Sequence, residues 1–591
     1  MAKKQAASKT GNDLRELIVV INTTEQAPAK TRSVSTLNKV LEKHRAEMTP
    51  LFGPASRLMP PSGYTSPELS EAVSMLSTFY MVKTTGDKDA LVKELSKDPA
   101  VEGAYLKPAP EPPVMLDMQE GTTRSVANID VPAVTPDFTS RQVYLNAAPA
   151  GIDALYAHKL SGGKGDGIKI IDIEGAWRFT HEDLIANQGG VIGGTQSTDL
   201  GWRNHGTAVL GEYSGDDNGK GIKGICPNAN VRAISIFGGM GSAQAIRSAA
   251  DALNAGDIIL IELHAPGPRY NFADRSDQKG YIAMEWWPDN FAAIKYATTK
   301  GVLVVEAAGN GAENLDDAIY NVRPSGFPAS WTNPFKTSNP QSGAIIVGAG
   351  APPPGTHGRN HGADRSRLGF SNYGARVDVQ GWGREVTTCG YGDLQGGPNE
   401  NFWYTDTFSG TSSASPIVVG ALGCIQGRLK NRSKALLTPA KAKTLLRTTG
   451  SPQQSEPGRP ATQRIGNRPD LKAAFSKLGI GKALLKEVKE FKEVKEYEKI
   501  KENIKENIKE LKEVEKQVKE IKEKDIYEGH KISEVINQRL DVIRPTSDVP
   551  TEADRIAQLE QAVLELQHYI SINERPDLLN PLLDEEGGTA E

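Results

Sequence analysis

The sequence has few cysteines and no long apolar run. Its 591 residues include 3 cysteines, Cys226, Cys389 and Cys424, which are too few and too widely spaced for a disulfide framework. None of them lies in a Cys-x-x-Cys pair, an arrangement that would suggest zinc. No apolar stretch approaches the roughly 18 residues that a membrane-spanning helix requires. We therefore expect at most one disulfide and no membrane span.

The chain also lacks a charge excess of either sign. It has 69 Lys and Arg against 73 Asp and Glu, with a formal net charge of -4 at pH 7. Binding to nucleic acid or to an anionic membrane favours a basic protein, so neither partner is predicted. The N-terminal sequence MAKKQAASKTGNDLRELIVVI has no apolar core followed by small residues, so no secretory signal is visible. The default expectation is a cytoplasmic protein, with non-classical export left open.

The length and the changes in composition predict several domains. The predicted segments are a small α+β domain over 1–110, a linker and processing region over 111–135, a large α/β domain over 136–480, a Lys/Glu-rich long helix over 481–528, a linker over 529–550, a short coiled coil over 551–572 and a tail over 573–591.

Residues 14–107 alternate between strand and helix patterns. LRELIVVI and STFYMVKT are rich in β-formers, whereas SVSTLNKVLEKHRAE and DKDALVKELSKDP have helical periodicity. The Pro/Gly/Ser-rich MPPSGYTSPELS separates the two halves, and KPAPEPP, which cannot join the interior of a sheet, follows them. This order predicts a small α+β domain followed by a linker.

The large domain has short β-branched runs separated by helical stretches. Examples of these runs are IKIIDI, IILIEL, GVLVVEAA and AIIVGA. Continuous apolar strands that alternate with helices indicate a parallel sheet with helices on both faces. The predicted fold class is therefore α/β.

The C-terminal part has helical patterns of two kinds. Between 488 and 521, apolar residues spaced by three and four within Lys/Glu-rich sequence predict one long solvated helix, a spacer stabilised by i,i+4 ion pairs. From 556 to 570 a regular three-four spacing predicts a short coiled coil. This second segment is the candidate for joining chains into a homo-oligomer or for docking on an assembly partner.

Three polar residues have the surroundings of catalytic side chains. Ser412 follows Gly410 and precedes a small-residue helix, so its hydroxyl would lie near a positive helix end. His205, in RNHGTAVLG, has the side chain whose pKa suits proton transfer near neutral pH. Asp172 follows the apolar strand IKII, at the edge of a parallel sheet where sites form. Each residue alone also fits an ordinary role in capping, packing or a surface turn.

Together these motifs resemble the subtilisin family (peptidase family S8), whose catalytic order along the chain is Asp, His, Ser. The motifs are GTSSASP at 410–416, NHGTAV at 204–209 and the strand ending at Asp172. The resemblance implies a subtilisin-like parallel sheet and a serine endopeptidase that acts on proteins or peptides. It assigns Ser412 as the nucleophile, His205 as the general base and Asp172 as the residue that orients the base.

The resemblance also implies an oxyanion hole. In GVLVVEAAGNGAEN, Asn310 matches the asparagine whose side-chain amide binds the oxyanion together with the backbone N-H of Ser412, although the same letters fit an Asn-Gly turn. Two departures concern the neighbouring segments. Ile173, Glu174 and Gly175 follow Asp172 where the family usually has a small hydroxyl residue and Gly. The letters IELHAPGPRY replace the family's Ser-Leu-Gly backbone that pairs with bound peptide, so substrate selectivity is the least transferable feature.

Two further features follow from the resemblance. The N-terminal domain is similar in architecture to the ferredoxin-like propeptides of subtilisins, which inhibit the active site, so the product would be a zymogen cleaved within 108–135. A plain interaction domain fits the same pattern. No cofactor is expected to be required, but structural calcium is implied at the oxygen-rich positions Asp183, Asp217 and Asn218, with Asp216 beside them. Solvated acidic turns are the alternative reading of these residues.

Overall fold

The computed structural model describes residues 14–22, 30–54, 66–114, 132 and 134–482, together with a few isolated helical positions between 499 and 516. The chain divides into two compact units, Met1–Val488 and Lys489–Glu591. Several predicted segments lie outside the described residues: most of the linker at 111–135, most of the helix at 481–528, the linker at 529–550, the coiled coil at 551–572 and the tail at 573–591. Within the described residues, no helix is both long enough and apolar enough to cross a membrane.

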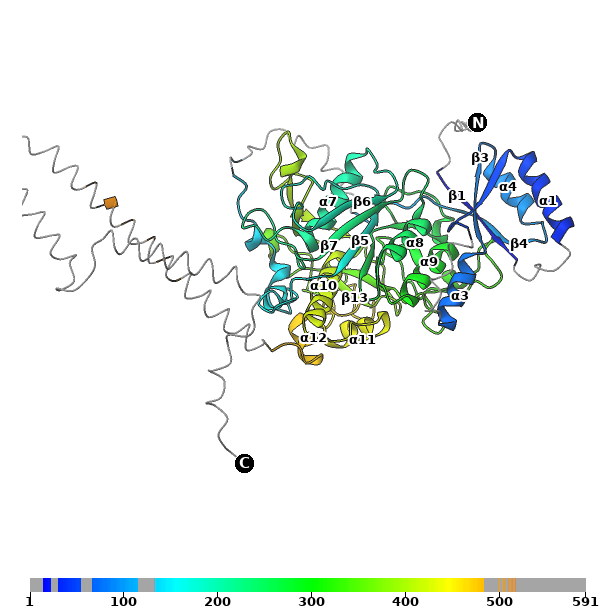
Figure 1. Ribbon diagram of the computed structural model, residues 1–591. Coiled ribbons are helices and arrows are strands. Elements are labelled where there is room, and N and C mark those ends of the chain that lie inside the picture. Colours follow the sequence, from blue (N-terminus) through cyan, green and yellow to red (C-terminus); the bar gives the residue numbers. More distant parts are fainter. Residues whose placement is uncertain are drawn as a thin grey trace, which may run out of the picture. The chain divides into compact units, whose positions relative to one another are not determined.

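The N-terminal part of the first unit is a four-stranded antiparallel sheet in the order β2-β3-β1-β4. Leucines of two helices cover one face of this sheet and form a separate apolar cluster with the strands. Figure 1 shows these two helices, α1 and α4, side by side. The elements are β1 (Glu16–Ile21), α1 (Lys30–Lys43), β2 (Ala46–Pro50), α3 (Pro67–Leu76), β3 (Phe79–Thr84), α4 (Lys88–Leu95) and β4 (Val101–Lys107).

Helix α3 was not expected, because its sequence lies partly in the Pro/Gly/Ser-rich segment. The local chemistry nevertheless favours a helix start. The side chain of Ser66 accepts a hydrogen bond from the backbone N-H of Leu69, and Pro67 occupies the first turn, where its missing N-H has no cost. The apolar face of α3 packs on α9 (Pro288–Thr299) of the large domain. The helix therefore connects the small sheet to the large domain.

The large domain is built on a seven-stranded sheet in the order β13-β12-β11-β8-β5-β7-β6, and every paired neighbour in it is parallel. This arrangement confirms the predicted α/β class. The strands are β5 (Lys169–Glu174), β6 (Gln188–Gly193), β7 (Asn230–Ser235), β8 (Ile258–Ile261), β11 (Leu303–Ala307), β12 (Ile345–Gly350) and β13 (Val379–Trp382).

Helices cover both faces of this sheet, and β5 shows how its sequence divides them. Successive side chains of a strand point to opposite faces. Ile171 and Ile173 of β5 belong to the apolar cluster that contains α8 (Ser242–Ala252) and α9, whereas Ile170 belongs to the cluster that contains the helices of the other face. The helices of that other face include α7 (Leu200–Ser214), α10 (Ser415–Asn431), α11 (Pro439–Thr449) and α12 (Leu471–Lys477). Two short antiparallel ribbons, β9 (His264–Pro266) with β10 (Tyr281–Ala283) and β14 (Val386–Cys389) with β15 (Tyr404–Phe408), complete the domain.

All three cysteines are buried and free. Burial raises the pKa of each thiol above its ordinary value. The disulfide that the sequence left open is therefore absent from the structure, and these thiols pack as small apolar side chains.

Buried polar contacts join the small sheet to the large domain. The ammonium group of Lys107, at the end of β4, lies 2.7 Å from Glu16 of β1 and also contacts Asp289 in the first turn of α9. The hydroxyl of Tyr105 donates to the other carboxylate oxygen of Asp289 over 2.9 Å. Lys107 and Asp289 are both fully buried. Loss of the lysine would leave two carboxylates without this partner at the interface.

Candidate active site

The serine predicted to be the nucleophile lies at the entrance of α10. Ser412 is three residues before the helix and is fully buried. Its hydroxyl donates a 2.9 Å hydrogen bond to the backbone carbonyl of Pro113. Gly410, at φ 117°, lets this segment approach, because a Cβ atom there would lie 2.1 Å from the same carbonyl oxygen. The serine therefore faces a segment from the predicted processing region.

His205 lies in α7, with its ring against Phe408. Its Nδ1 atom lies 2.7 Å from Oε2 of Glu174, and both side chains are fully buried. Its Nε2 atom has no hydrogen-bond partner among the described residues. Burial lowers the pKa of His205 to about 3, against the opposing charge of Asp172. The imidazole is therefore neutral near pH 7 and can accept a proton.

The carboxylate that contacts His205 in the structure is that of Glu174 and not that of Asp172, the residue predicted to orient the histidine. Strand β5 continues two residues beyond Asp172 and ends at Glu174, so the carboxylate nearest the end of the strand is the glutamate. Because side chains two apart share a face of a strand, the two carboxyl groups lie on the same side of the sheet. Glu174 contacts the histidine, while Oδ2 of Asp172 accepts a 2.6 Å hydrogen bond from the indole N-H of Trp177.

The two carboxyl groups also interact with each other. Burial raises the pKa of Asp172 well above its ordinary range, and the charge of Glu174 raises it further. Burial also raises the pKa of Glu174 well above its ordinary range, and the neighbouring Asp172 carboxyl opposes this shift. A carboxyl group that keeps its proton can donate to a neighbouring carboxylate. The arrangement is thus a chain of interactions from Asp172 to Glu174 to His205.

Asn310 follows β11 and lies beside the serine turn. Its Oδ1 atom accepts hydrogen bonds from the backbone N-H of Thr411, at 2.9 Å, and from the Thr411 hydroxyl, at 3.0 Å. Its Nδ2 atom donates to Oε1 of Gln278 over 3.1 Å. Its backbone N-H donates to Nδ1 of His264. The side-chain amide is therefore held from both ends, next to the residue that precedes Ser412.

Residues 111–114 run through the site as a short segment that is bridged to the large domain at both ends. The backbone N-H of Glu111 donates to the His264 carbonyl over 2.9 Å, and the N-H of His264 donates back over 3.1 Å. Val114 forms a second antiparallel bridge with Gly410. The pairing at His264 falls within the segment IELHAPGPRY, whose letters differ from those of the family. The backbone geometry for pairing with a peptide is present despite those letters.

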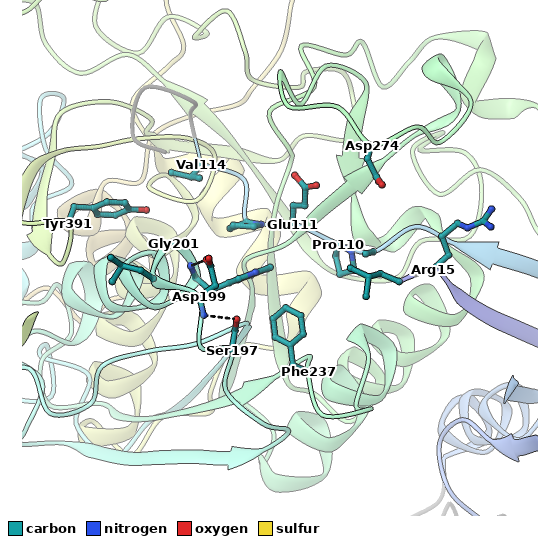
Figure 2. Close-up of a pocket in the computed structure, with 15 residues that line it drawn as sticks. Arg15, Pro110, Glu111, Val114, Ser197, Asp199, Gly201, Phe237, Asp274 and Tyr391 are labelled. Carbon is teal, nitrogen blue, oxygen red and sulfur yellow. Dashed lines mark hydrogen bonds between the residues drawn. The ribbon is translucent and has the colours of Figure 1, made fainter. Parts of the chain in front are cut away.

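A cleft of about 840 Å³ lies beside this segment. Figure 2 shows Glu111 and Val114 on one side of the space and Phe237 on the other. Trp202 adds a second aromatic ring to the lining of the cleft, and Asp274 adds a carboxylate. Side chains that flank the bound segment would meet this mixed apolar and acidic lining.

The predicted calcium ligands do not fit a cation. Asp183 accepts hydrogen bonds from Nδ2 of Asn218, from a backbone N-H and from a tyrosine hydroxyl. Asp217 forms ion pairs with two lysines, and Asp216 accepts from backbone N-H groups. Oxygens that face donors of hydrogen bonds are not arranged to coordinate Ca²⁺. Within the described residues, no group of three or more acidic, histidine or cysteine side chains could hold a metal ion.

The sequence reasoning did not identify Glu174 or Gln278 as site residues. The alternation of β5 could have identified Glu174, because it shares a face with Asp172 and lies closer to the end of the strand. No comparable signal exists for Gln278, which comes from a loop between β9 and β10 and reaches the site through tertiary contacts alone.

Comparisons with known proteins identify the large domain. The pattern of the Subtilase family (Peptidase S8) matches residues 179–474. Subtilisin DY of Bacillus licheniformis is 27% identical over 282 residues, which are 47% of this chain and 84% of that protein. The major intracellular serine protease of Bacillus subtilis (strain 168) is 27% identical over 311 residues, 49% of this chain and 79% of that protein. The epidermin leader peptide processing serine protease of Staphylococcus aureus covers 78% of this chain and 98% of its own at 20% identity, with a TM-score of 0.45.

Proposed function

We propose that this chain, which belongs to the subtilase family, is made as a zymogen whose own residues 111–114 block its active site. Family membership and the subtilisin relatives make it a subtilisin-like serine endopeptidase, an enzyme that hydrolyses peptide bonds of proteins. The observation that carries the proposal is the hydrogen bond from the Ser412 hydroxyl to the Pro113 carbonyl. A carbonyl group of the chain itself therefore lies against the Ser412 hydroxyl, which supports the proposal.

We assign the catalytic roles from the contacts in the site. Ser412 is the nucleophile and His205 is the base that takes its proton through Nε2, the nitrogen without a partner among the described residues. Glu174 accepts the hydrogen bond of Nδ1 and so fixes the tautomer that leaves Nε2 unprotonated. Asn310 supplies a side-chain N-H to the oxyanion, together with the backbone N-H of Ser412.

The reaction then proceeds by acyl transfer. The serine oxygen attacks the carbonyl carbon, and its proton moves to Nε2 of His205 while negative charge develops on the carbonyl oxygen. The C-N bond breaks, the imidazolium gives its proton to the leaving amine, and an ester to Ser412 remains. Water attacks this ester by the same route, which releases the acid and restores the hydroxyl. The imidazolium is stabilised throughout by the Glu174 carboxylate.

The bound segment has the features of an inhibitor that is cleaved slowly. Its position makes Pro113 the residue that contributes the carbonyl of the scissile bond (P1) and Pro112 the preceding residue (P2). Neither proline has a backbone N-H, so neither donates a hydrogen bond to the walls of the cleft. The N-H of Val114 donates to the Pro112 carbonyl over 2.8 Å, which turns the chain instead of extending it. The hydroxyl of Ser412 donates to the carbonyl rather than to His205.

The small sheet anchors this segment. Strand β4 ends at Lys107, only four residues before Glu111, and the buried contact of Lys107 with Asp289 fixes that end of the strand on α9. A short connection limits the freedom of the inhibitory segment and raises its effective concentration at the site. These contacts of the α+β domain support a role as an inhibitory propeptide better than a role as an independent interaction domain.

A Ser412→Ala variant tests both parts of the proposal. Purified wild-type protein should hydrolyse casein, whereas the variant should not. Mass spectrometry of the wild type should reveal a new N-terminus at Val114, and the variant should stay intact. A scaffold that only binds peptides would give equal, null activity for both proteins. An active wild type without a new terminus would contradict the zymogen but leave the endopeptidase intact.

The C-terminal heptads at 556–570 carry a separate proposal. Their spacing supports a short coiled coil that joins chains or docks on an assembly partner. Deletion of 551–591 should reduce the mass measured by light scattering if the segment makes a homo-oligomer. An unchanged mass would contradict that role.

A further inference from the structure

Gln278 is a buried polar residue in a loop that is otherwise mostly exposed or half-buried. It lies between Asp277 and Lys279 in the connection from β9 to β10, yet only 2% of it is exposed. Its backbone has φ 51°, a conformation that non-glycine residues seldom adopt and that costs free energy. A strained backbone and a buried amide persist only where surrounding contacts compensate for them.

Both ends of the Gln278 amide make contacts in the active site. Its Oε1 atom accepts the hydrogen bond from Nδ2 of Asn310 at 3.1 Å. Its Nε2 atom donates to the carbonyl of Pro112 at 3.2 Å. One planar amide therefore connects the proposed oxyanion donor to the residue in the P2 position of the bound segment.

We propose that Gln278 is a positioning residue that couples binding of the P2 carbonyl to the orientation of the Asn310 amide. The inference rests on the proposed function, in which Asn310 binds the oxyanion. The Asn310 amide has one acceptor and two N-H donors. Thr411 holds the acceptor and Gln278 holds one donor, which leaves the second N-H in a fixed direction for the oxyanion.

The consequence is that a bound peptide orients the Asn310 side-chain N-H through its own P2 carbonyl. When the P2 carbonyl binds Nε2 of Gln278, it fixes the rotation of that amide about its last side-chain bond. This rotation places Oε1 against Asn310. A preorganised donor stabilises the transition state more than the ground state, so the coupling acts on kcat more than on KM.

A double-mutant cycle tests this coupling. Gln278→Met keeps the length of the side chain but removes its amide, and Asn310→Ala removes the oxyanion donor. Because one oxyanion donor is worth 10² to 10³ in kcat, we expect loss of its positioning partner to lower kcat about tenfold, with KM changed by less than about threefold. In the Asn310→Ala background the Gln278→Met change should have no further effect on kcat. Losses that multiply, or no loss in the single variant, would overturn the proposal.

The neighbouring Lys279→Ala provides the matched control, because the side chain of Lys279 is exposed and its backbone N-H, which the substitution keeps, donates to Asp277. Its kcat and KM should equal those of the wild type. A purely structural role for Gln278 would lower the unfolding temperature of Gln278→Met and reduce the amount of titratable active site. The coupling predicts instead an unchanged number of sites with a slower kcat.

A modified substrate tests the same coupling by the ratio of two kcat values measured within each protein, so the amount of active variant cancels. We compare a peptide p-nitroanilide with its analogue in which sulfur, a weaker acceptor, replaces the P2 carbonyl oxygen. The wild type should lose about tenfold in kcat on the analogue, and Gln278→Met should lose little. Equal losses in both proteins would overturn the coupling. Failure of the proposed function would look different, since the wild type would then hydrolyse neither substrate.

Discussion

Replacement of Glu174 by Gln removes the negative charge beside His205 and changes almost nothing in shape. The carboxylate oxygen lies 2.7 Å from Nδ1, and both groups are fully buried. A glutamine can present its amide N-H at that distance, which would favour the tautomer with the proton on Nε2. That tautomer cannot accept the proton of Ser412. The variant should therefore fold and bind peptides but react slowly.

The size of the effect follows from the contact. In serine proteases, exchange of the carboxylate that orients the histidine for its amide lowers kcat by about 10⁴, which corresponds to about 5.4 kcal/mol in the activation free energy. Full burial leaves no water to replace the carboxylate of Glu174, so we expect a loss of about 10³ to 10⁴. The variant Asp172→Asn should behave differently. Its amide oxygen can still accept from the indole of Trp177, and the carboxylate that contacts His205, that of Glu174, is kept.

The assay is the steady-state hydrolysis of one peptide p-nitroanilide by the wild type and the two variants, with active sites titrated by a fluorophosphonate. Glu174→Gln should lose 10³ or more in kcat, whereas Asp172→Asn should keep kcat within about tenfold of the wild type. The reverse order, with the aspartate variant nearly inactive and the glutamate variant active, would refute the contact chain and restore Asp172 as the residue that orients the histidine.

Three further predictions concern the zymogen and its stability. Lys107→Met in the Ser412→Ala background leaves the buried carboxylate of Asp289 without its cation, so we expect a loss of about 3 kcal/mol in the free energy of urea unfolding, and an unchanged midpoint would contradict the interface. Gly410→Ala places a Cβ atom 2.1 Å from the Pro113 carbonyl, so peptide hydrolysis should fall by about 10²-fold while the protein still folds; full activity would show that the segment does not bind there. Burial lowers the pKa of His158 to about 4, below its ordinary 6.5, so the unfolded chain binds more protons between those values and stability falls as the pH drops from 6.5 to 4. In the Ser412→Ala background, His158→Gln should lose less stability between pH 7 and 4.5 than its parent, and equal losses would refute the assignment.

The sequence predicted the order of the main elements because their patterns are local. The β-branched runs of the large domain became β5, β8, β11 and β12, and the first and third strands of the small domain matched the β-rich stretches. Helix α3 was missed because its capping by Ser66 and its packing on α9 outweigh the turn-forming letters around it.

The site was only partly predictable. Motif letters selected Ser412, His205 and Asn310 as candidates, but the carboxylate beside the histidine depends on where β5 ends, and strand ends are not fixed by local pattern. For this reason the sequence indicated Glu174 only as a difference from the family pattern and not as part of the site. The contact of residues 111–114 with Ser412 joins positions about three hundred residues apart in the chain, and no periodicity reports a contact of that kind.

The central claim is that Ser412 is a nucleophile activated by His205, and the most direct measurement is the site of fluorophosphonate attachment in the intact protein. After removal of the inhibitory segment, peptide mass spectrometry should find the phosphonyl group on Ser412 of the wild type. The Ser412→Ala variant should carry none, and His205→Ala should react far more slowly. A wild type that stays unlabelled, or that carries the label on another residue, would contradict the account.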